Sequence, residues 1–87
     1  MYGKTCGERV RILRSQNAET MEAFGARIGG HLNTVRNWER GIALPSAESI
    51  MTICEEYNIR ADWLRGLAPL DVMRPVGWNR EAKNDRA

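Results

Sequence analysis

The sequence of 87 residues predicts one small all-α domain, and three observations support this fold class. Apolar residues recur at helical spacing, most clearly within residues 50–57. Residues 20–41 show the pattern of a helix, a tight glycine turn and a second helix. Residues that can cap a helix precede three of the apolar stretches, at Thr5, Thr20 and Ser46.

The first predicted helix starts at Cys6, after a disordered lead at residues 1–4. Thr5 and Glu8 have the spacing of a capping box, in which two side chains satisfy free backbone N–H groups of the first turn. The outer face of this helix carries three arginines. Hydration is the simplest interpretation of these arginines, and we keep it for Arg9.

The second predicted helix begins after Thr20, whose hydroxyl can accept a free backbone N–H of the opening turn. Phe24 and Ile28 fall one turn apart on an apolar stripe. Gly29 and Gly30 should end this helix, because glycine adopts turn conformations at little steric cost.

The third predicted helix spans about residues 31–40 and ends at Gly41. Val35 and Trp38 point to one side of it. The opposite arc carries residue types that suit the DNA major groove, because asparagine can bond adenine, arginine can bond guanine or phosphate, and an apolar residue can meet a thymine methyl group. These residues are Leu32, Asn33, Arg36, Asn37 and Arg40. Taken alone, the helix could equally be an ordinary amphipathic helix with a hydrated polar face.

A loop at residues 42–45 follows, in which Leu44 is expected to plug the core. Ser46 should cap the fourth helix, and Asn58 is a plausible left-handed stop at its end. A short fifth helix should follow at residues 61–65.

The fifth helix contains two large apolar residues, Trp63 and Leu64. On so short an element, we expect one of them to belong to the core and the other to serve a partner subunit.

Residues 67–78 form a segment with its own character. Two prolines argue against a continuous helix there. The segment is nevertheless too apolar for a hydrated tail, since it contains Leu70, Val72, Met73, Val76 and Trp78. We expect a short extended C-terminal segment that lies against the globule or a second subunit, with a frayed polar end at residues 79–87. The expected division is therefore a domain at residues 1–66 and an extension at residues 67–87.

Several of these elements together resemble the lambda-repressor-like helix-turn-helix family (Xre or Cro type). The resemblance covers roughly residues 5–66 and is carried, in order, by Thr20, Gly29, Thr34-Val35, Trp38-Glu39-Arg40-Gly41, Pro45-Ser46 and Asp62-Trp63-Leu64. It implies a five-helix DNA-binding domain in which the second and third helices form the helix-turn-helix and the third helix reads the DNA.

The resemblance also implies an ion pair between Arg14 and Glu39, which would brace the first helix against the reading helix. A partly buried pair of this kind costs more to break than an exposed one.

Three departures from the family pattern affect the expected DNA contacts. Met21 stands where the family usually has a glutamine that anchors to phosphate, so one phosphate contact is expected to be weakened or replaced. Gly30 and His31 replace the usual residues at the start of the reading helix, where His31 should cap or touch a phosphate, and Arg60 replaces a usual serine cap. Base reading is assigned to Leu32, Asn33, Arg36 and Asn37, and phosphate contacts to Thr20, Met21, His31 and Arg40.

The charge distribution agrees with a DNA-binding face. Residues 1–41 carry seven Lys or Arg against four Asp or Glu, whereas residues 42–66 carry two against four. The basic part of the chain thus coincides with the predicted helix-turn-helix, as a surface that attracts phosphate requires.

Other classes of protein find little support. Cys6, Cys54 and the single histidine cannot supply a recognisable set of zinc ligands, and the two cysteines form no disulfide framework. We therefore expect no metal and no cofactor. His31 has no nucleophile or carboxylate pair nearby in the sequence, so we expect no enzyme. No stretch approaches the ~20 apolar residues of a membrane span, and no signal-peptide pattern is seen. The expected location is the cytoplasm of a bacterial or phage-infected cell, without a membrane partner.

The predicted function is a sequence-specific regulator that binds double-stranded DNA, as a homodimer on a palindromic operator. It could be a phage repressor or Cro-like protein, a restriction-modification controller, or an antitoxin that represses its own promoter. Dimerisation is expected to use Trp63, Leu64, Leu70 and Val72. The alternative is a protein-binding module of the same fold that neutralises a partner such as a toxin, which the apolar segment at residues 67–78 favours.

Overall fold

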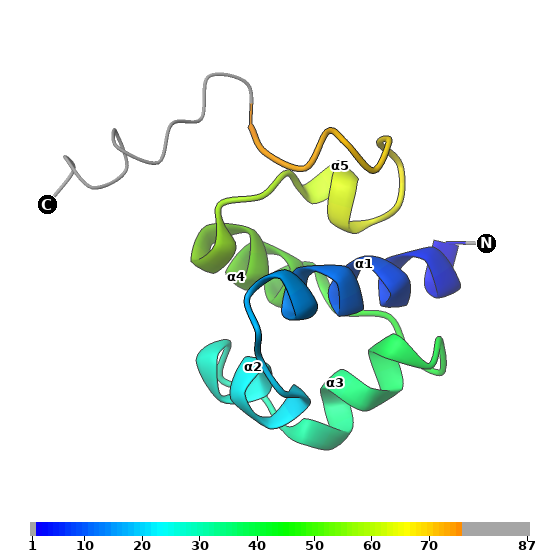
Figure 1. Cartoon of the computed structure of the whole chain (residues 1–87). Helices are drawn as coiled ribbons and strands as arrows, with labels where there is room; N and C mark the ends of the chain where they lie inside the picture. The colour runs from blue at the N-terminus through cyan, green and yellow to red at the C-terminus, as the bar shows by residue number, and fades with distance from the viewer. Residues whose placement is uncertain (1, 76–87) are drawn as a thin grey trace, which may run out of the picture.

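The computed structural model describes residues 2–75, and all of its regular structure in that range is helical. The five helices are α1 (Tyr2–Gln16), α2 (Met21–Arg27), α3 (Leu32–Glu39), α4 (Ala47–Tyr57) and α5 (Ala61–Leu64). In Figure 1, α1 crosses the middle of the domain, with α2 and α3 on one side of it and α5 on the other. The predicted all-α, five-helix class is confirmed.

All five helices contribute to one hydrophobic core. Its buried residues are Val10, Leu13, Phe24, Val35, Trp38, Ile50, Ile53, Tyr57, Ile59, Trp63, Leu64 and Ala68. The caps of α4 are those predicted: the Ser46 hydroxyl accepts the Ser49 N–H at 3.1 Å, and Asn58 has the left-handed angles φ 56° and ψ 56°.

The start of α1 differs from the prediction. The helix begins at Tyr2, so Thr5 lies inside it and does not cap it, and residues 2–4 are helical rather than a disordered lead. Inside the helix, Thr5 makes a tertiary contact. A Cβ placed on Gly66 would come within 2.3 Å of the Thr5 methyl carbon, so Thr5 packs directly against Gly66, two residues beyond the end of α5.

Arg9 is not hydrated, and that interpretation is wrong. The residue is 9% exposed, and its Nη1 donates to the carbonyl oxygens of Trp63 at 3.1 Å and Ala68 at 3.0 Å. Its guanidinium carbon also lies 5.0 Å from the centroid of the Trp63 ring. The Trp63 carbonyl lies in α5 and also accepts the Gly66 N–H at 3.0 Å, and the Ala68 carbonyl lies in the segment after α5. Arg9 therefore ties α1 to both α5 and the segment that follows it.

The prediction for Leu44 is also wrong. This side chain is 48% exposed, and the buried residue of the loop is its neighbour Pro45. Pro45 immediately precedes Ser46, the cap of α4, and the described core does not include Leu44.

Trp63 and Leu64 are both completely buried in the core of their own chain. The expectation that one of them serves a partner subunit is therefore wrong. The short α5 packs against both α1 and α4, so each of its large side chains has a neighbouring helix to contact.

The segment after α5 lies against the globule, which is one of the two predicted alternatives; the other was a second subunit. The indole Nε1 of Trp63 donates to the Leu70 carbonyl at 2.9 Å, and the Arg60 N–H donates to the Met73 carbonyl at 2.9 Å. Arg74 donates to the Asn58 carbonyl at 3.2 Å. Val76, Trp78 and residues 79–87 lie outside the described residues, and the division of the chain at residue 66 stays a prediction.

Within residues 2–75, no helix is long and apolar enough to cross a membrane.

Candidate nucleic-acid interface

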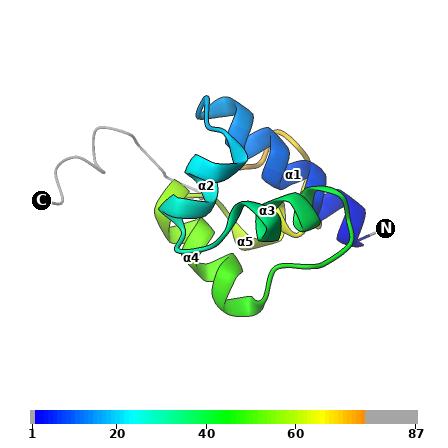
Figure 2. The same cartoon turned by 90° about the horizontal axis from the view of Figure 1, so that it is seen from below.

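The pair α2–α3 forms the predicted helix-turn-helix. The Thr20 hydroxyl accepts the Ala23 N–H at 3.0 Å and so caps α2. Gly29 turns the chain with φ +75°, and the Gly30 N–H donates to the Gly25 carbonyl at 2.7 Å. Seen from below in Figure 2, both helices lie on the side of the domain that faces the viewer. The turn thus presents α3 at the surface.

Gly25 allows α2 and α3 to lie this close, and the sequence analysis missed it. A Cβ on Gly25 would be 3.2 Å from the carbonyl carbon of His31 and 3.4 Å from a methyl carbon of Val35. The distance to His31 is shorter than an ordinary contact, so a side chain here would require the start of α3 to move by a few tenths of an ångström. Only the general scarcity of glycine within helices could have signalled this position.

The two faces of α3 separate as predicted. Val35 and Trp38 are buried, whereas Asn33, Arg36 and Arg40 are exposed. Leu32 is 36% exposed at the edge of the polar arc, and Asn37 is half-buried. The polar edge therefore faces away from the core, which is the arrangement that a helix needs to enter a groove. That these residues contact bases stays a prediction.

The exposed face of α3 contains one side-chain hydrogen bond. Nη1 of Arg36 donates to Oδ1 of Asn33 at 3.2 Å. The two residues are one turn apart, where helical side chains are neighbours. The sequence predicts two independent readers, whereas in the structure a hydrogen bond joins them.

The predicted ion pair between Arg14 and Glu39 is confirmed. Arg14 donates from Nε to one carboxylate oxygen at 2.7 Å and from Nη2 to the other at 3.0 Å. The side chain of Glu39 is only 5% exposed and that of Arg14 is 17% exposed. The hydrogen bond to Glu39 raises the pKa of Arg14, and Nη1 of Arg14 also donates to the Glu19 carbonyl at 2.9 Å. The pair fixes α1 to the C-terminal end of α3.

The predicted phosphate contacts fall into two groups. Thr20, His31 and Arg40 are exposed on the helix-turn-helix, and His31 occupies the N-cap position of α3 without a side-chain capping hydrogen bond. Met21 is different, because its side chain is partly buried against the core. A thioether has no hydrogen to donate, so the Met21 side chain cannot replace the donor of a glutamine. Only the backbone N–H of Met21, at the start of α2, could donate to a phosphate, and this contact stays a prediction.

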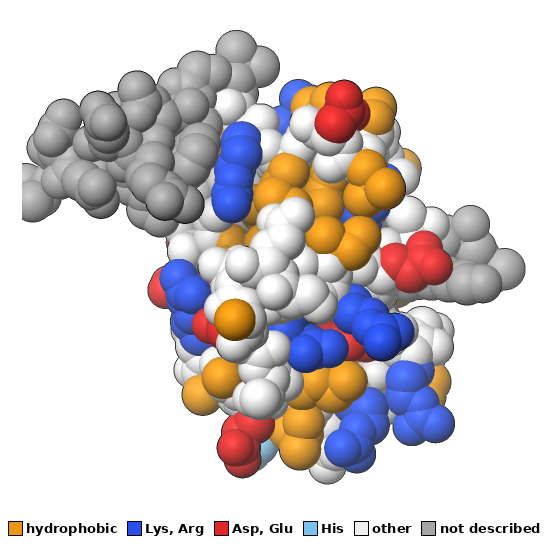
Figure 3. All heavy atoms as spheres, viewed as in Figure 1, with side chains coloured by type: hydrophobic (Ala, Val, Ile, Leu, Met, Phe, Trp, Pro, Cys, Tyr) orange, Lys and Arg blue, Asp and Glu red, His pale blue; other side chains and the backbone are white. Residues whose placement is uncertain are grey.

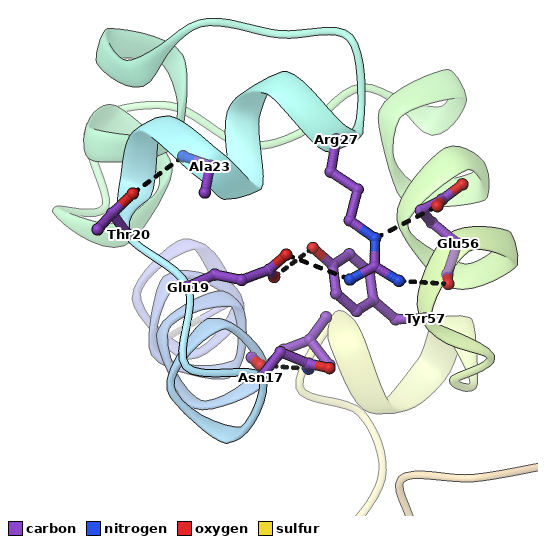
Figure 4. A network of polar contacts seen from close by, with 8 residues as sticks. Asn17, Glu19, Thr20, Ala23, Arg27, Glu56 and Tyr57 are labelled. Carbon is purple, nitrogen blue, oxygen red and sulfur yellow. Dashed lines mark hydrogen bonds and ion pairs between the residues drawn. The ribbon is translucent and has the colours of Figure 1, made fainter.

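A second polar network holds α2 against α4, and the sequence did not reveal it. In Figure 4, the side chains of Glu19, Arg27 and Tyr57 converge from the α1–α2 connection, α2 and α4. The Tyr57 hydroxyl donates to Glu19 at 2.6 Å, and Arg27 bonds Glu19 at 3.2 Å and Glu56 at 3.3 Å. Burial and the hydrogen bond to Glu19 raise the pKa of Tyr57. Because these partners are far apart in sequence, no local pattern could have indicated them.

Gly7 lies where α1 and α3 approach closely, and the sequence did not indicate it. A Cβ on Gly7 would lie 2.2 Å from the Trp38 carbonyl oxygen and 3.1 Å from Cα of Glu39. The absence of a side chain at Gly7 therefore allows the backbones of α1 and α3 to come this close.

Charged and apolar side chains occupy different parts of the surface. In Figure 3, Lys and Arg side chains gather over α1 and α3 at the lower right, and hydrophobic side chains gather over α5 and the segment after it at the top. The basic surface thus adjoins the exposed face of α3. Among residues 2–75, no group of three or more His, Cys, Asp or Glu side chains could hold a metal ion.

Comparisons with known proteins agree with this architecture. A family model described as helix-turn-helix matches residues 11–64. The uncharacterized HTH-type transcriptional regulator YazB of Bacillus subtilis (strain 168) is 34% identical over 64 residues, which are 74% of this chain and 93% of that protein.

Two solved structures of the P22 c2 repressor are similar in fold. One is the repressor in complex with the synthetic operator 9T, with a TM-score of 0.67, 24% identity, and coverage of 72% of this chain and 96% of that one. The other is the solution structure of its DNA-binding domain, with a TM-score of 0.65, 25% identity, and coverage of 76% and 88%.

Proposed function

Because the chain belongs to the helix-turn-helix family of DNA-binding transcriptional regulators, which are not enzymes, we propose that it binds a specific double-stranded operator through α3. We further propose that it acts as a repressor or Cro-like protein, as a dimer on a palindromic site. The observation that carries the proposal is the exposed edge of α3, which lies opposite the buried Val35 and Trp38. The P22 c2 repressor, which shares this fold, has been crystallised with an operator.

The contacts should divide according to position on the helix. Leu32, Asn33, Arg36 and Asn37 lie on the arc that would face the floor of the major groove, where base edges are read. Arg40 follows the last residue of α3, toward the DNA backbone, and should hold phosphate. Thr20 and His31, at the N-terminal ends of α2 and α3, should lie near phosphates as well.

Two substitutions test this division. Asn37→Ala should weaken operator binding by about 1–3 kcal/mol and relax the preference at one base pair, because a base contact is lost. Arg40→Ala should weaken binding to all sequences alike, because a phosphate contact is lost. It should also reduce the salt slope, which is the slope of the logarithm of affinity against the logarithm of salt concentration, by about one unit. The measurement is binding to the operator, its single-base variants and random DNA across a salt series.

Arg60→Ala is a matched control for Arg40→Ala. It removes the same charge, but Arg60 pairs with Asp62 at 2.6 Å beside α5, across α1 from the reading helix. Its salt slope should equal that of the wild type. If Asn37→Ala keeps both the strength and the ranking of the wild type on all the operator variants, α3 is not the reader.

The proposed dimer would use the apolar surface after Gly41, without the buried Trp63 and Leu64. Leu70 is 59% exposed and Leu67 is 64% exposed, and an open pocket of about 400 Å³ lies between α4 and α5. Helix-turn-helix dimers bind two half-sites about 34 Å apart, so a palindromic operator requires two copies.

Light scattering at micromolar concentration should therefore report two subunits. Leu70→Glu should shift the protein toward the monomer, because it places a charge in an apolar interface. Ala26→Glu, on the exposed surface of α2, introduces the same charge elsewhere and should leave the dimer intact. A wild-type protein that stays monomeric even on DNA would contradict the dimer.

One observation supports the alternative of a protein-binding module, such as an antitoxin that neutralises a toxin. Ile42, Leu44 and Met51 are exposed, as are the leucines after α5, and exposed apolar side chains are typical of surfaces that bind proteins when they gather in a patch. The alternative would lead if Asn37→Ala left DNA binding unchanged.

A further inference from the structure

We propose that Asn33 and Arg36 act as a single guanine-selecting unit, in which Asn33 positions the Arg36 guanidinium and does not itself read adenine. The inference rests on the proposed function, since it concerns how α3 reads DNA. Its basis is the hydrogen bond from Nη1 of Arg36 to Oδ1 of Asn33 at 3.2 Å. Both residues are exposed on the face of α3 that lies opposite Val35 and Trp38.

The hydrogen bond changes what Asn33 can recognise. An asparagine that reads adenine must use both ends of its amide: Nδ2 donates to N7, and Oδ1 accepts from the N6 amino group. Here Oδ1 already accepts from a cation. An adenine amino group would have to approach that oxygen beside a guanidinium, which carries only donors and a positive charge. The pair therefore disfavours the amino group of adenine.

Apart from the second lone pair of Oδ1, which lies beside the guanidinium, the groups that remain available are donors. Arg36 keeps Nε, Nη2 and the second hydrogen of Nη1, and Asn33 keeps Nδ2. In the major groove, guanine presents two adjacent acceptors, N7 and O6, whereas adenine and cytosine each present an amino donor. A fork of arginine donors matches the guanine edge bidentately. The composite surface of Asn33 and Arg36 thus selects guanine.

The pairing also restrains Arg36 before DNA binds. No other described residue makes a hydrogen bond or ion pair with its guanidinium, so Asn33 is the restraint that residues 2–75 supply. An arginine that is already partly ordered loses less side-chain freedom on binding. Asn33 is therefore a positioning residue, and its loss should be seen at the base that Arg36 reads.

The experiment selects DNA fragments from a random pool with the wild-type protein, and then measures binding to every single-base variant of the selected site. Arg36→Ala should abolish the preference for guanine at one position. Asn33→Ala should reduce the discrimination at that same position by about fivefold, the size expected from one exposed hydrogen bond. Asn33→Ala added to Arg36→Ala should change the preferences no further.

Asn33→Asp separates positioning from mere presence of the side chain. It keeps an acceptor for Arg36, so the preference for guanine should persist. Its negative charge should lower the affinity for all sequences alike. A purely structural role for Asn33 would instead make Asn33→Ala change the affinity without changing the ranking of bases at the Arg36 position.

The outcomes separate this inference from the function on which it rests. If Asn33→Ala removes a preference for adenine at a different position and leaves the guanine preference intact, Asn33 is an independent reader and the inference is overturned. A selected site without a guanine that depends on Arg36 overturns it as well, although α3 could still read DNA. If the wild type enriches no sequence, the proposed function itself fails and the inference fails with it.

Discussion

Gly7→Ala is expected to lower the free energy of unfolding by about 2–3 kcal/mol, the upper part of the range of about 1–3 kcal/mol that is typical of overpacking. The new Cβ would lie 2.2 Å from the Trp38 carbonyl oxygen, so the backbones of α1 and α3 would have to separate. Alanine has the higher helix propensity, but that gain is only about 1 kcal/mol. The steric cost of the new Cβ therefore exceeds the gain in helix propensity, and the net result is a loss of stability. Denaturant unfolding of the two proteins measures the difference.

Gly30→Ala is the matched control. Here the nearest atom to the new Cβ would be the Gly25 carbonyl oxygen at 3.8 Å, an ordinary contact. This variant should be close to the wild type in stability.

The operator affinity of Gly7→Ala should also fall, because the substitution would shift α3 relative to α1. If Gly7→Ala were as stable as the wild type, α1 and α3 would not lie as close as the structure places them.

Arg14→Ala is expected to cost about 3 kcal/mol of stability, because it leaves the carboxylate of Glu39 buried without its partner. Glu39→Ala should cost less. Arg14 is more exposed than Glu39 and keeps its hydrogen bond to the Glu19 carbonyl at 2.9 Å when the carboxylate is removed. The structure thus predicts an asymmetry between the two single variants, which denaturant unfolding can resolve.

The double variant Arg14→Ala/Glu39→Ala should lose less than the sum of the two single losses, since the pair is already broken by the first change. Strictly additive losses would show that the two side chains do not interact. The exposed pair of Arg27 and Glu56, at 3.3 Å, provides a comparison. Glu56→Ala should cost less than about 1 kcal/mol, as is usual for ion pairs at the surface.

Features of this protein that depend on neighbours along the chain could be predicted from the residues alone. The caps at Thr20 and Ser46, the left-handed stop at Asn58 and the turn at Gly29 all follow from local chemistry, and each lies where it was predicted. Helical periodicity also separated the buried edge of α3 from its exposed edge. The pairing of Arg14 with Glu39 came from the family resemblance, because 25 residues separate the partners.

The tertiary structure alone decided the features that depend on which helices meet. Arg9 is buried because α5 ends beside α1, and Trp63 and Leu64 are both in the core because α5 has a helix on each side. Gly7 is required because two backbones cross there. The network of Glu19, Arg27 and Tyr57 joins parts of the chain that only folding brings together. No pattern along the sequence encodes such a contact directly, because its partners are determined by helix crossing and not by spacing.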